Sequence, residues 1–177
     1  KAAEAEYAPA QCSLGLRYEL GDGVETDLPR AAELYRAAAE QDYAPAQCNF
    51  AVCLLNGNGV ERDPVQAAAW LKRAAEQNFP RGLYLLGLCS KAGDGIQADS
   101  IAAAELFRRA AGEEYPPAQC ELGLCYETGE GVEKDEKRAA GLYRQAAGRD
   151  YAAAECNLGF CYLTGLGVEV DYAQAVE

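Results

Sequence analysis

Apolar residues recur along this chain at helical spacing, in pairs of segments. In the first segment, Tyr7, Leu14 and Tyr18 are 7 and 4 residues apart, which places them on one face of a helix. The second segment, at about 28–41, carries its own helical stripe of apolar residues: Ala31, Leu34, Tyr35 and Ala38. The pattern therefore predicts a unit made of a first helix, a turn and a second helix.

A glycine-rich turn separates the two helices and returns every 36 residues. Its first copy is Gly-Asp-Gly-Val-Glu-Thr-Asp at 21–27, and further copies stand at 57–63, 93–99, 129–135 and 165–171. Glycine reaches left-handed backbone angles without a Cβ clash, so we expect the turn glycines to have positive φ. The final aspartate of each copy is a good cap for the second helix. A fixed period of this length indicates a solenoid of stacked repeats.

The domain organisation follows from this period. We predict one continuous repeat array over residues 1–177, because stacked repeats share a core that grows with each added unit. Residues 1–6 match the tail of a preceding second helix. Four whole repeats and one partial repeat follow: 7–42, 43–78, 79–114, 115–150 and 151–177.

Charge and hydropathy exclude two classes of partner. The net charge of −12 argues against nucleic acid, because phosphate binding needs lysines and arginines clustered on one face. The same charge either keeps a regular monomeric array from self-associating or attracts a cationic partner. No apolar run approaches the roughly 18 residues of a membrane span, so we expect no membrane insertion.

The residues that usually carry catalysis are missing or are explained by structure. The chain has no histidine, which excludes a Cys–His nucleophile within it. The Gly-x-Gly turns follow a helix and occur five times, which fits a structural turn and not a dinucleotide or phosphate site. A calcium loop in these turns lacks the required ladder of oxygen ligands. We therefore expect no enzyme and no catalytic, cofactor or metal site.

Eight cysteines fall at two positions of the first helix. Cys48 and Cys53 are five residues apart, about 500° of helical rotation, so such a pair points to different sides and does not easily form a disulfide. We expect free, packed thiols, with inter-repeat disulfides and a cysteine-only metal site as alternatives. Free thiols would indicate a reducing compartment. The two columns are Cys12, Cys48, Cys120 and Cys156, and Cys53, Cys89, Cys125 and Cys161.

A column of cations runs along the second helices. We expect these side chains to pair with neighbouring acidic residues, and such exposed pairs contribute little to stability. The column consists of Arg36, Lys72, Arg108 and Arg144.

The last copy, Ala-Glu-Cys-Asn-Leu-Gly-Phe-Cys-Tyr-Leu-Thr-Gly-Leu-Gly-Val-Glu-Val-Asp-Tyr-Ala-Gln-Ala at 154–175, resembles a Sel-one-like repeat (SLR), a relative of the tetratricopeptide repeat. Five in-phase copies extend the resemblance over essentially the whole chain. It implies an all-α fold, a right-handed superhelical αα solenoid of 36-residue helix-turn-helix repeats, and a role in binding proteins or peptides. Members of the family serve as adaptors in assembly, endoplasmic-reticulum quality control and bacterial host interaction. In its secreted cysteine-rich branch, the cysteines have a different spacing and link the end of a second helix to the next first helix. This chain lacks that cysteine spacing.

The first helices line the concave surface in this kind of superhelix. At 100° per residue, Leu16 and Glu19 lie near the side of the helix opposite Leu14 and Tyr18. An apolar strip there is either buried between adjacent first helices or exposed as a groove that holds a peptide. Tyr84 is the best single anchor, because an aromatic ring with a polar tip is enriched at binding hot spots. The candidate partner-binding residues are Leu16, Val52, Tyr84, Leu88, Leu124 and Phe160, with Glu19, Lys91 and Glu127 at the polar rim.

These observations predict a non-enzymatic protein–protein interaction scaffold or adaptor, which binds a peptide or protein segment in the concave groove lined by the first helices. The alternative is a regulatory or targeting repeat arm of a larger enzyme or signalling protein, since the sequence starts and stops within a repeat. A self-assembling structural array is a third possibility. Under all three hypotheses, we expect a protein or peptide partner and no cofactor.

Overall fold

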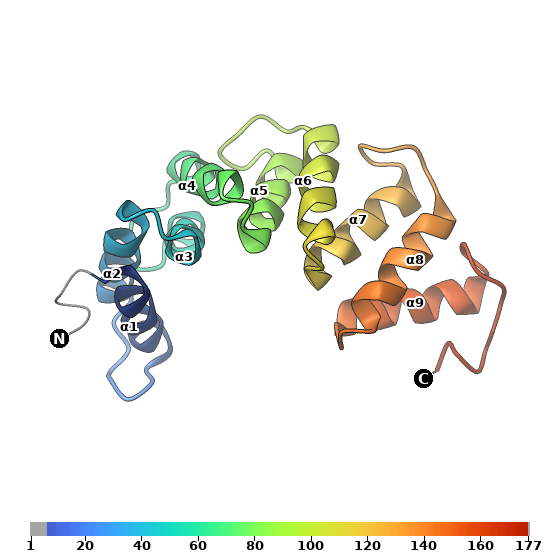
Figure 1. The fold of residues 1–177 in the computed structure, drawn as a ribbon, viewed down its shortest axis with the longest axis horizontal. Coiled ribbons are helices and arrows are strands. Elements are labelled where there is room, and N and C mark those ends of the chain that lie inside the picture. The colour runs from blue at the N-terminus through green and yellow to red at the C-terminus, as the bar shows by residue number, and fades with distance from the viewer. Residues whose placement is uncertain (1–6, 177) are drawn as a thin grey trace. The chain divides into compact units, whose positions relative to one another are not determined.

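The computed structural model describes residues 7–176, which form helices joined by turns (Figure 1). Within this range there are nine α-helices and no strand, so the expected all-α repeat fold is confirmed. The expectation for residues 1–6 lies outside the described residues. The helices are α1 (Ala8–Leu20), α2 (Leu28–Glu40), α3 (Ala44–Asn56), α4 (Pro64–Glu76), α5 (Pro80–Ala92), α6 (Ser100–Gly112), α7 (Pro116–Thr128), α8 (Glu136–Ala147) and α9 (Ala152–Thr164).

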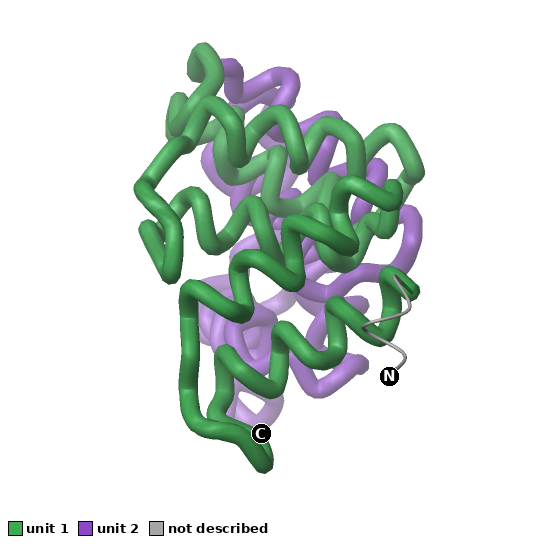
Figure 2. Tube along the Cα trace, turned by 90° about the vertical axis from the view of Figure 1, so that its left-hand side faces the viewer, with its two compact units in different colours: residues 1–98 green, residues 99–177 purple. Residues whose placement is uncertain are grey.

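The chain divides into two compact units (Figure 2). Unit 1 spans residues 1–98 and contains α1 to α5, and unit 2 spans residues 99–177 and contains α6 to α9. The boundary falls inside the glycine-rich turn of the third repeat. Each unit is described by itself below, and the continuity of the array across this turn stays a prediction.

Two kinds of helix start alternate along the chain. Each first helix follows an extended aromatic residue that makes no side-chain cap; at Tyr7, φ is −82° and ψ is 108°. Each second helix follows an aspartate whose carboxylate accepts from the first-turn backbone, as Asp27 Oδ1 does from the Arg30 N–H at 2.9 Å. The expected caps are therefore confirmed. The same bond forms at Asp63, Asp99 and Asp135.

From the second turn onward, the second glycine of the turn lies against the backbone of the preceding repeat. Gly59 has a φ of 73°, and a Cβ added to it would stand 2.2 Å from the carbonyl oxygen of Leu28, the first residue of α2. Positive φ was expected from the sequence; this close approach was not. The equivalent glycines meet the start of the preceding second helix in the same way: Gly95 at Pro64, Gly131 at Ser100 and Gly167 at Glu136.

Small residues of the first helix make room for the largest side chain of the second. The Tyr35 ring is fully buried, and a Cβ on Gly15 would meet it at 2.8 Å. Gly123 stands in the same relation to Tyr143, at 2.5 Å. In the second repeat the smaller Leu71 takes the place of the ring, and an alanine takes the place of the glycine. Each repeat therefore matches the two side chains in size.

We predict that Gly59→Val lowers the free energy of unfolding by more than about 2 kcal/mol. The left-handed backbone alone costs about 1–2 kcal/mol for a residue with a Cβ, and the added atom also collides with the Leu28 carbonyl group. Thermal and urea unfolding measure the effect.

A matched control changes a glycine that has neither constraint. Gly141 lies inside α8, and an added Cβ meets nothing within 4 Å. Gly141→Ala should therefore raise the free energy of unfolding by roughly 0.5–1 kcal/mol. A Gly59→Val protein that unfolds together with the parent would contradict the turn packing.

Candidate functional site

The first helices of successive repeats touch one another within each unit. In unit 1, α1 contacts α3 and α3 contacts α5, and in unit 2, α7 contacts α9. We call the outward surface of these helices, on the side away from the second helices, the first-helix face. All nine candidate residues lie on first helices: Leu16 and Glu19 on α1, Val52 on α3, Tyr84, Leu88 and Lys91 on α5, Leu124 and Glu127 on α7, and Phe160 on α9.

The apolar candidates of unit 1 keep part of their surface in solvent. Leu16 is 45% exposed, and Val52, Tyr84 and Leu88 are half-buried. None of the four is fully buried between neighbouring first helices. The structure therefore places a partly exposed apolar strip on α1, α3 and α5.

Unit 2 carries two of the apolar candidates. Phe160 is 52% exposed on α9. Leu124 is half-buried on α7 and packs against the core cluster that contains Tyr143 and Cys161. Phe160 is thus the more accessible residue, whereas part of the Leu124 side chain serves the core.

The two acidic rim residues reach back to the second helix of their own repeat. The Tyr35 hydroxyl donates to Glu19 Oε2 at 2.5 Å, and the Tyr143 hydroxyl donates to Glu127 Oε2 at 2.6 Å. Burial and the neighbouring carboxylate raise the pKa of both tyrosines. The expectation that these positions face away from the second helix is therefore wrong for the two carboxylates. Lys91, at the third rim position, is half-buried.

The sequence contains a signal for these bonds. Tyrosine occurs with glutamate 16 residues before it in the first and fourth repeats. In the second repeat, leucine stands at both positions, as Leu71 and Leu55. A buried phenol needs an acceptor, so the two positions change together.

Polar bonds also connect neighbouring first helices. In unit 1, the Asn49 amide donates to Cys12 Sγ at 3.5 Å, and Arg81 Nη1 donates to Asn49 Oδ1 at 2.6 Å. In unit 2, Asn157 donates to Cys120 Sγ at 3.4 Å. Sequence reasoning missed these contacts, because they join positions in different repeats.

None of the eight cysteines forms a disulfide, and all but Cys156 are buried. Burial raises the pKa of Cys48 to about 12 and that of Cys53 to about 11, so both thiols stay protonated at neutral pH. A protonated, buried thiol is a poor nucleophile and a poor metal ligand. Within residues 7–176, no cluster of three or more cysteine or acidic side chains is arranged to hold a metal ion.

The cation column on the second helices pairs with several kinds of group. Arg36 Nε lies 2.9 Å from Glu40 Oε1, and Arg108 forms an ion pair with Glu105, which confirms the expectation for these two residues. Arg144 instead donates to the Tyr162 hydroxyl at 3.2 Å.

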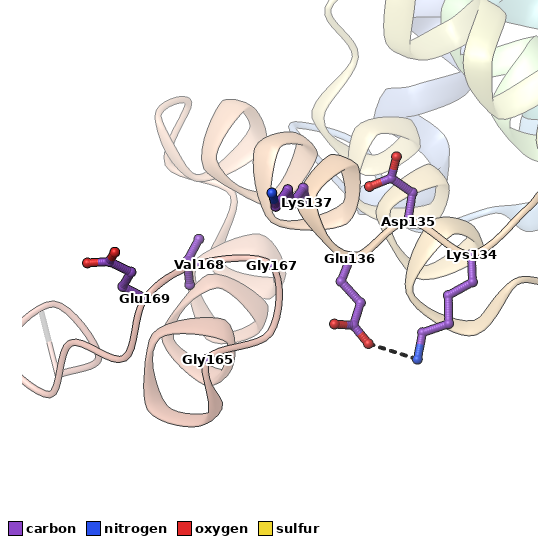
Figure 3. A pocket seen from close by; sticks show the side chains of 8 residues that line it. All are labelled: Lys134, Asp135, Glu136, Lys137, Gly165, Gly167, Val168 and Glu169. Carbon is purple, nitrogen blue, oxygen red and sulfur yellow. Dashed lines mark ion pairs between the residues drawn. The ribbon is translucent and has the colours of Figure 1, made fainter.

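A hollow of about 790 Å³ lies between the start of α8 and the turn of the last repeat (Figure 3). Figure 3 shows Lys134 and Glu136 turned toward each other, and Lys134 Nζ lies 2.8 Å from Glu136 Oε1. Gly167 also lines the hollow, and it packs on the Glu136 carbonyl group. The side chains that line the hollow carry charges of both signs, and Lys134 and Glu136 already form an ion pair with each other. We therefore interpret this hollow as a product of turn packing. It is lined by Lys134, Asp135, Glu136, Lys137, Gly165, Gly167, Val168 and Glu169.

We predict that a chromogenic thiol reagent, used in denaturant without reductant, titrates all eight cysteines. In the native protein the exposed Cys156 should react first, because the other thiols are buried. Cys156→Ser should remove the fast phase and leave a total of seven. A count near zero in the parent would instead indicate disulfides and an oxidising compartment.

The tyrosine–glutamate bonds predict a loss of stability at alkaline pH. The pKa of Tyr143 is higher in the folded chain than the value of about 10 in the unfolded chain. Its contribution is therefore fully present below pH 10 and is lost as the pH rises above 10. Tyr143→Phe should lower the free energy of unfolding by about 1 kcal/mol at pH 7, and the alkaline loss should become shallower.

Urea unfolding between pH 7 and pH 11 checks this prediction. Tyr7→Phe serves as the control, because the Tyr7 side chain is 61% exposed. This substitution should change neither the free energy of unfolding at pH 7 nor its loss at alkaline pH. If the free energy of unfolding fell equally steeply with pH in the Tyr143→Phe protein and in the parent, the proposed role of the bond would be contradicted.

Comparisons with known proteins follow the repeat pattern. The Sel1 repeat matches residues 8–43, 44–79, 80–113, 116–151 and 152–177. A search of curated proteins finds no significant match. No helix within residues 7–176 is both long enough and apolar enough to cross a membrane.

Solved structures with the same fold cover nearly all of the chain. It is 36% identical to c5321, a protective antigen of uropathogenic Escherichia coli strains that displays an SLR fold, with a TM-score of 0.88, 98% of this chain covered and 37% of that one. It is 33% identical to a Sel1 repeat protein from Oxalobacter formigenes, with a TM-score of 0.87 and coverages of 97% and 68%. The immunity protein Pa5087 from Pseudomonas aeruginosa is 27% identical, with a TM-score of 0.69 and coverages of 96% and 62%.

The chain thus spans little more than a third of the length of the Escherichia coli protein. Five repeats match the family pattern, and two solved structures share a third or more of the aligned residues. Sel1 repeats are generally protein-interaction modules. The chain belongs to the Sel1 repeat family.

Proposed function

We propose that this chain is a non-enzymatic interaction scaffold, and that its first-helix face binds a peptide or protein segment. The observation that carries the proposal is the partly exposed apolar strip of unit 1, formed by Leu16, Val52, Tyr84 and Leu88. Apolar surface in water is unfavourable by roughly 25 cal/mol per Å², and a bound segment would recover part of that free energy.

Tyr84 is larger than the residue that the other repeats carry at its position. Four of the five repeats carry cysteine where the third carries Tyr84. The ring is therefore not required by the repeat, and it remains half-buried on α5. Large aromatic side chains with a polar tip are common at the centres of binding surfaces.

Polar groups beside the strip are held in fixed positions. The Arg81 guanidinium is oriented by Asn49, and the Glu19 carboxylate is oriented by the Tyr35 hydroxyl. A pre-oriented donor and acceptor lower the entropy lost when a peptide backbone or side chain binds. Phe160, Leu124 and Glu127 lie on the first helices of unit 2 and form the corresponding surface there.

The same surface also suits a regulatory or targeting arm of a longer protein. The Escherichia coli protein of known structure is longer than this chain, which covers 37% of it. The binding face would then recruit a partner for a domain elsewhere in such a protein.

We predict that Tyr84→Ala weakens binding on the first-helix face by about 1–2 kcal/mol or more, with helicity unchanged. A peptide selected from a displayed library on the immobilised chain supplies the ligand, and calorimetry measures its affinity for each variant. Tyr84→Cys, which restores the residue of the other repeats, should weaken binding to a similar extent.

The control is Val65→Ala, because Val65 is 69% exposed on the second helix α4. It should leave the affinity unchanged. The first-helix assignment fails if Val65→Ala weakens the complex while Tyr84→Ala does not.

A further inference from the structure

The one tryptophan of the chain lines a hollow on the second-helix side of unit 1. The hollow has a volume of about 450 Å³ and takes its walls from α2, α3 and α4. We call it the Trp70 pocket; it is lined by Arg36, Glu40, Phe50, Gln66, Ala69, Trp70 and Arg73.

Trp70 differs from the residues at the equivalent position of the other second helices. The equivalent residue is leucine in the other three second helices, as Leu34, Leu106 and Leu142. Repeat packing therefore does not require the larger indole ring. The ring stays half-buried, and its partner on the pocket floor is Phe50, with ring centroids 5.9 Å apart in an edge-to-face arrangement.

Arg73 completes an aromatic–cationic surface. Its guanidinium carbon lies 4.6 Å from the centroid of the Trp70 ring, a distance at which the cation is attracted to the ring face. Tryptophan and arginine are the residue types most enriched at binding hot spots. The contact with Trp70 therefore holds the Arg73 guanidinium beside the apolar surface formed by Trp70 and Phe50.

Among the residues that line the pocket, cations outnumber carboxylates, and the exposed Asp42 carboxylate lies beside Arg73. Two guanidiniums, Arg36 and Arg73, stand against one carboxylate, Glu40, in a chain with 28 acidic and 16 basic residues. Both arginines form ion pairs with exposed partners: Arg36 with Glu40 at 2.9 Å and Arg73 with Asp42 at 3.1 Å. Exposed pairs contribute little, so a ligand carboxylate can replace the present partner.

A second hollow of about 430 Å³ shares Arg36, Phe50 and Gln66 with the pocket. Arg62 lies there beside Glu61 and Asp63, and its guanidinium is already paired with Asp94 at 2.9 Å. The Asp63 carboxylate is already used, because it accepts from the Gln66 N–H at 2.9 Å.

We propose that the Trp70 pocket is a second docking site, separate from the first-helix face, for a short acidic peptide segment that places an apolar side chain against Trp70 and Phe50. Its flanking carboxylates pair with the guanidiniums of Arg36 and Arg73. Bidentate arginine–carboxylate pairs fix the orientation of the segment, and the aromatic floor provides the apolar contact.

The test uses this tryptophan as its own reporter. A displayed library of random octapeptides is selected on the immobilised chain, and each selected peptide is titrated against the fluorescence of Trp70. Peptides that shift the emission should share acidic residues next to an aliphatic or aromatic one. Calorimetry then gives their affinities for the variants.

The chain itself supplies matched variants. Trp70→Leu introduces the residue found at this position in the other second helices, and Arg73→Gln introduces the residue of the fourth repeat, Gln145. Each substitution should lower the affinity for the acidic peptides about 10-fold or more, and its thermal unfolding should stay close to that of the parent. Glu40→Gln removes the one carboxylate and should strengthen binding, whereas Tyr84→Ala should leave it unchanged.

Several results would overturn the proposal. The acidic specificity is wrong if the peptides that shift Trp70 emission are basic or uncharged, or if Glu40→Gln weakens them. The site is wrong if no selected peptide shifts the emission, or if Trp70→Leu binds as well as the parent. Concentration-dependent dimers in sedimentation that disappear in Trp70→Leu would make this surface a self-association interface instead. Loss of the acidic peptides in Tyr84→Ala, with Trp70→Leu unaffected, would place their site on the first-helix face and overturn the proposal.

Discussion

The contact on which the repeat stacking depends is the approach of a turn glycine to a backbone carbonyl group of the preceding repeat. Gly59 reaches the Leu28 carbonyl so closely that no Cβ fits between them. Leu28 is the first residue of α2, and Asp27, which caps that helix, holds its first turn in place. The cap and the glycine thus act together: one fixes the helix start, and the other packs on it. Because both recur with the period, the same step from one repeat to the next is used in each unit.

This stacking leaves the side chains free to vary, and the variation is of two kinds. Some substitutions are compensated inside the repeat: Tyr35 occurs with Gly15 and Glu19, whereas Leu71 occurs with an alanine and a leucine. Such sets preserve packing and satisfy polar groups, so they need no functional reason. Trp70 and Tyr84 are different, because each is larger than its column requires and stays half-buried. Positions at which one repeat departs from the residue of all the others are where function is expected.

The sequence predicted the backbone better than the surface. Helix positions, caps and positive φ follow from a period and from the stereochemistry of single residues, and these expectations agree with the structure. The bond of Glu19 to Tyr35 was missed, because a helical wheel describes where a Cβ points and not how far a long side chain reaches back. The Asn49 bonds to Cys12 and Arg81 were missed since they link three repeats. The Trp70 pocket depends on α2, α3 and α4 together, so no single stripe of residues indicates it.

A stack of two-helix repeats has two long faces, and in unit 1 the two faces differ in chemistry. On the first helices, an apolar strip is flanked by an amide-bound arginine and a tyrosine-bound carboxylate. On the second helices, an indole ring lies under a guanidinium and beside another. Tyr84 and Trp70 belong to different helix rows of one compact unit, so a segment bound at one face would leave the other open. If both proposals hold, the unit can hold two partners at once, which is the property that distinguishes a scaffold from a simple peptide receptor.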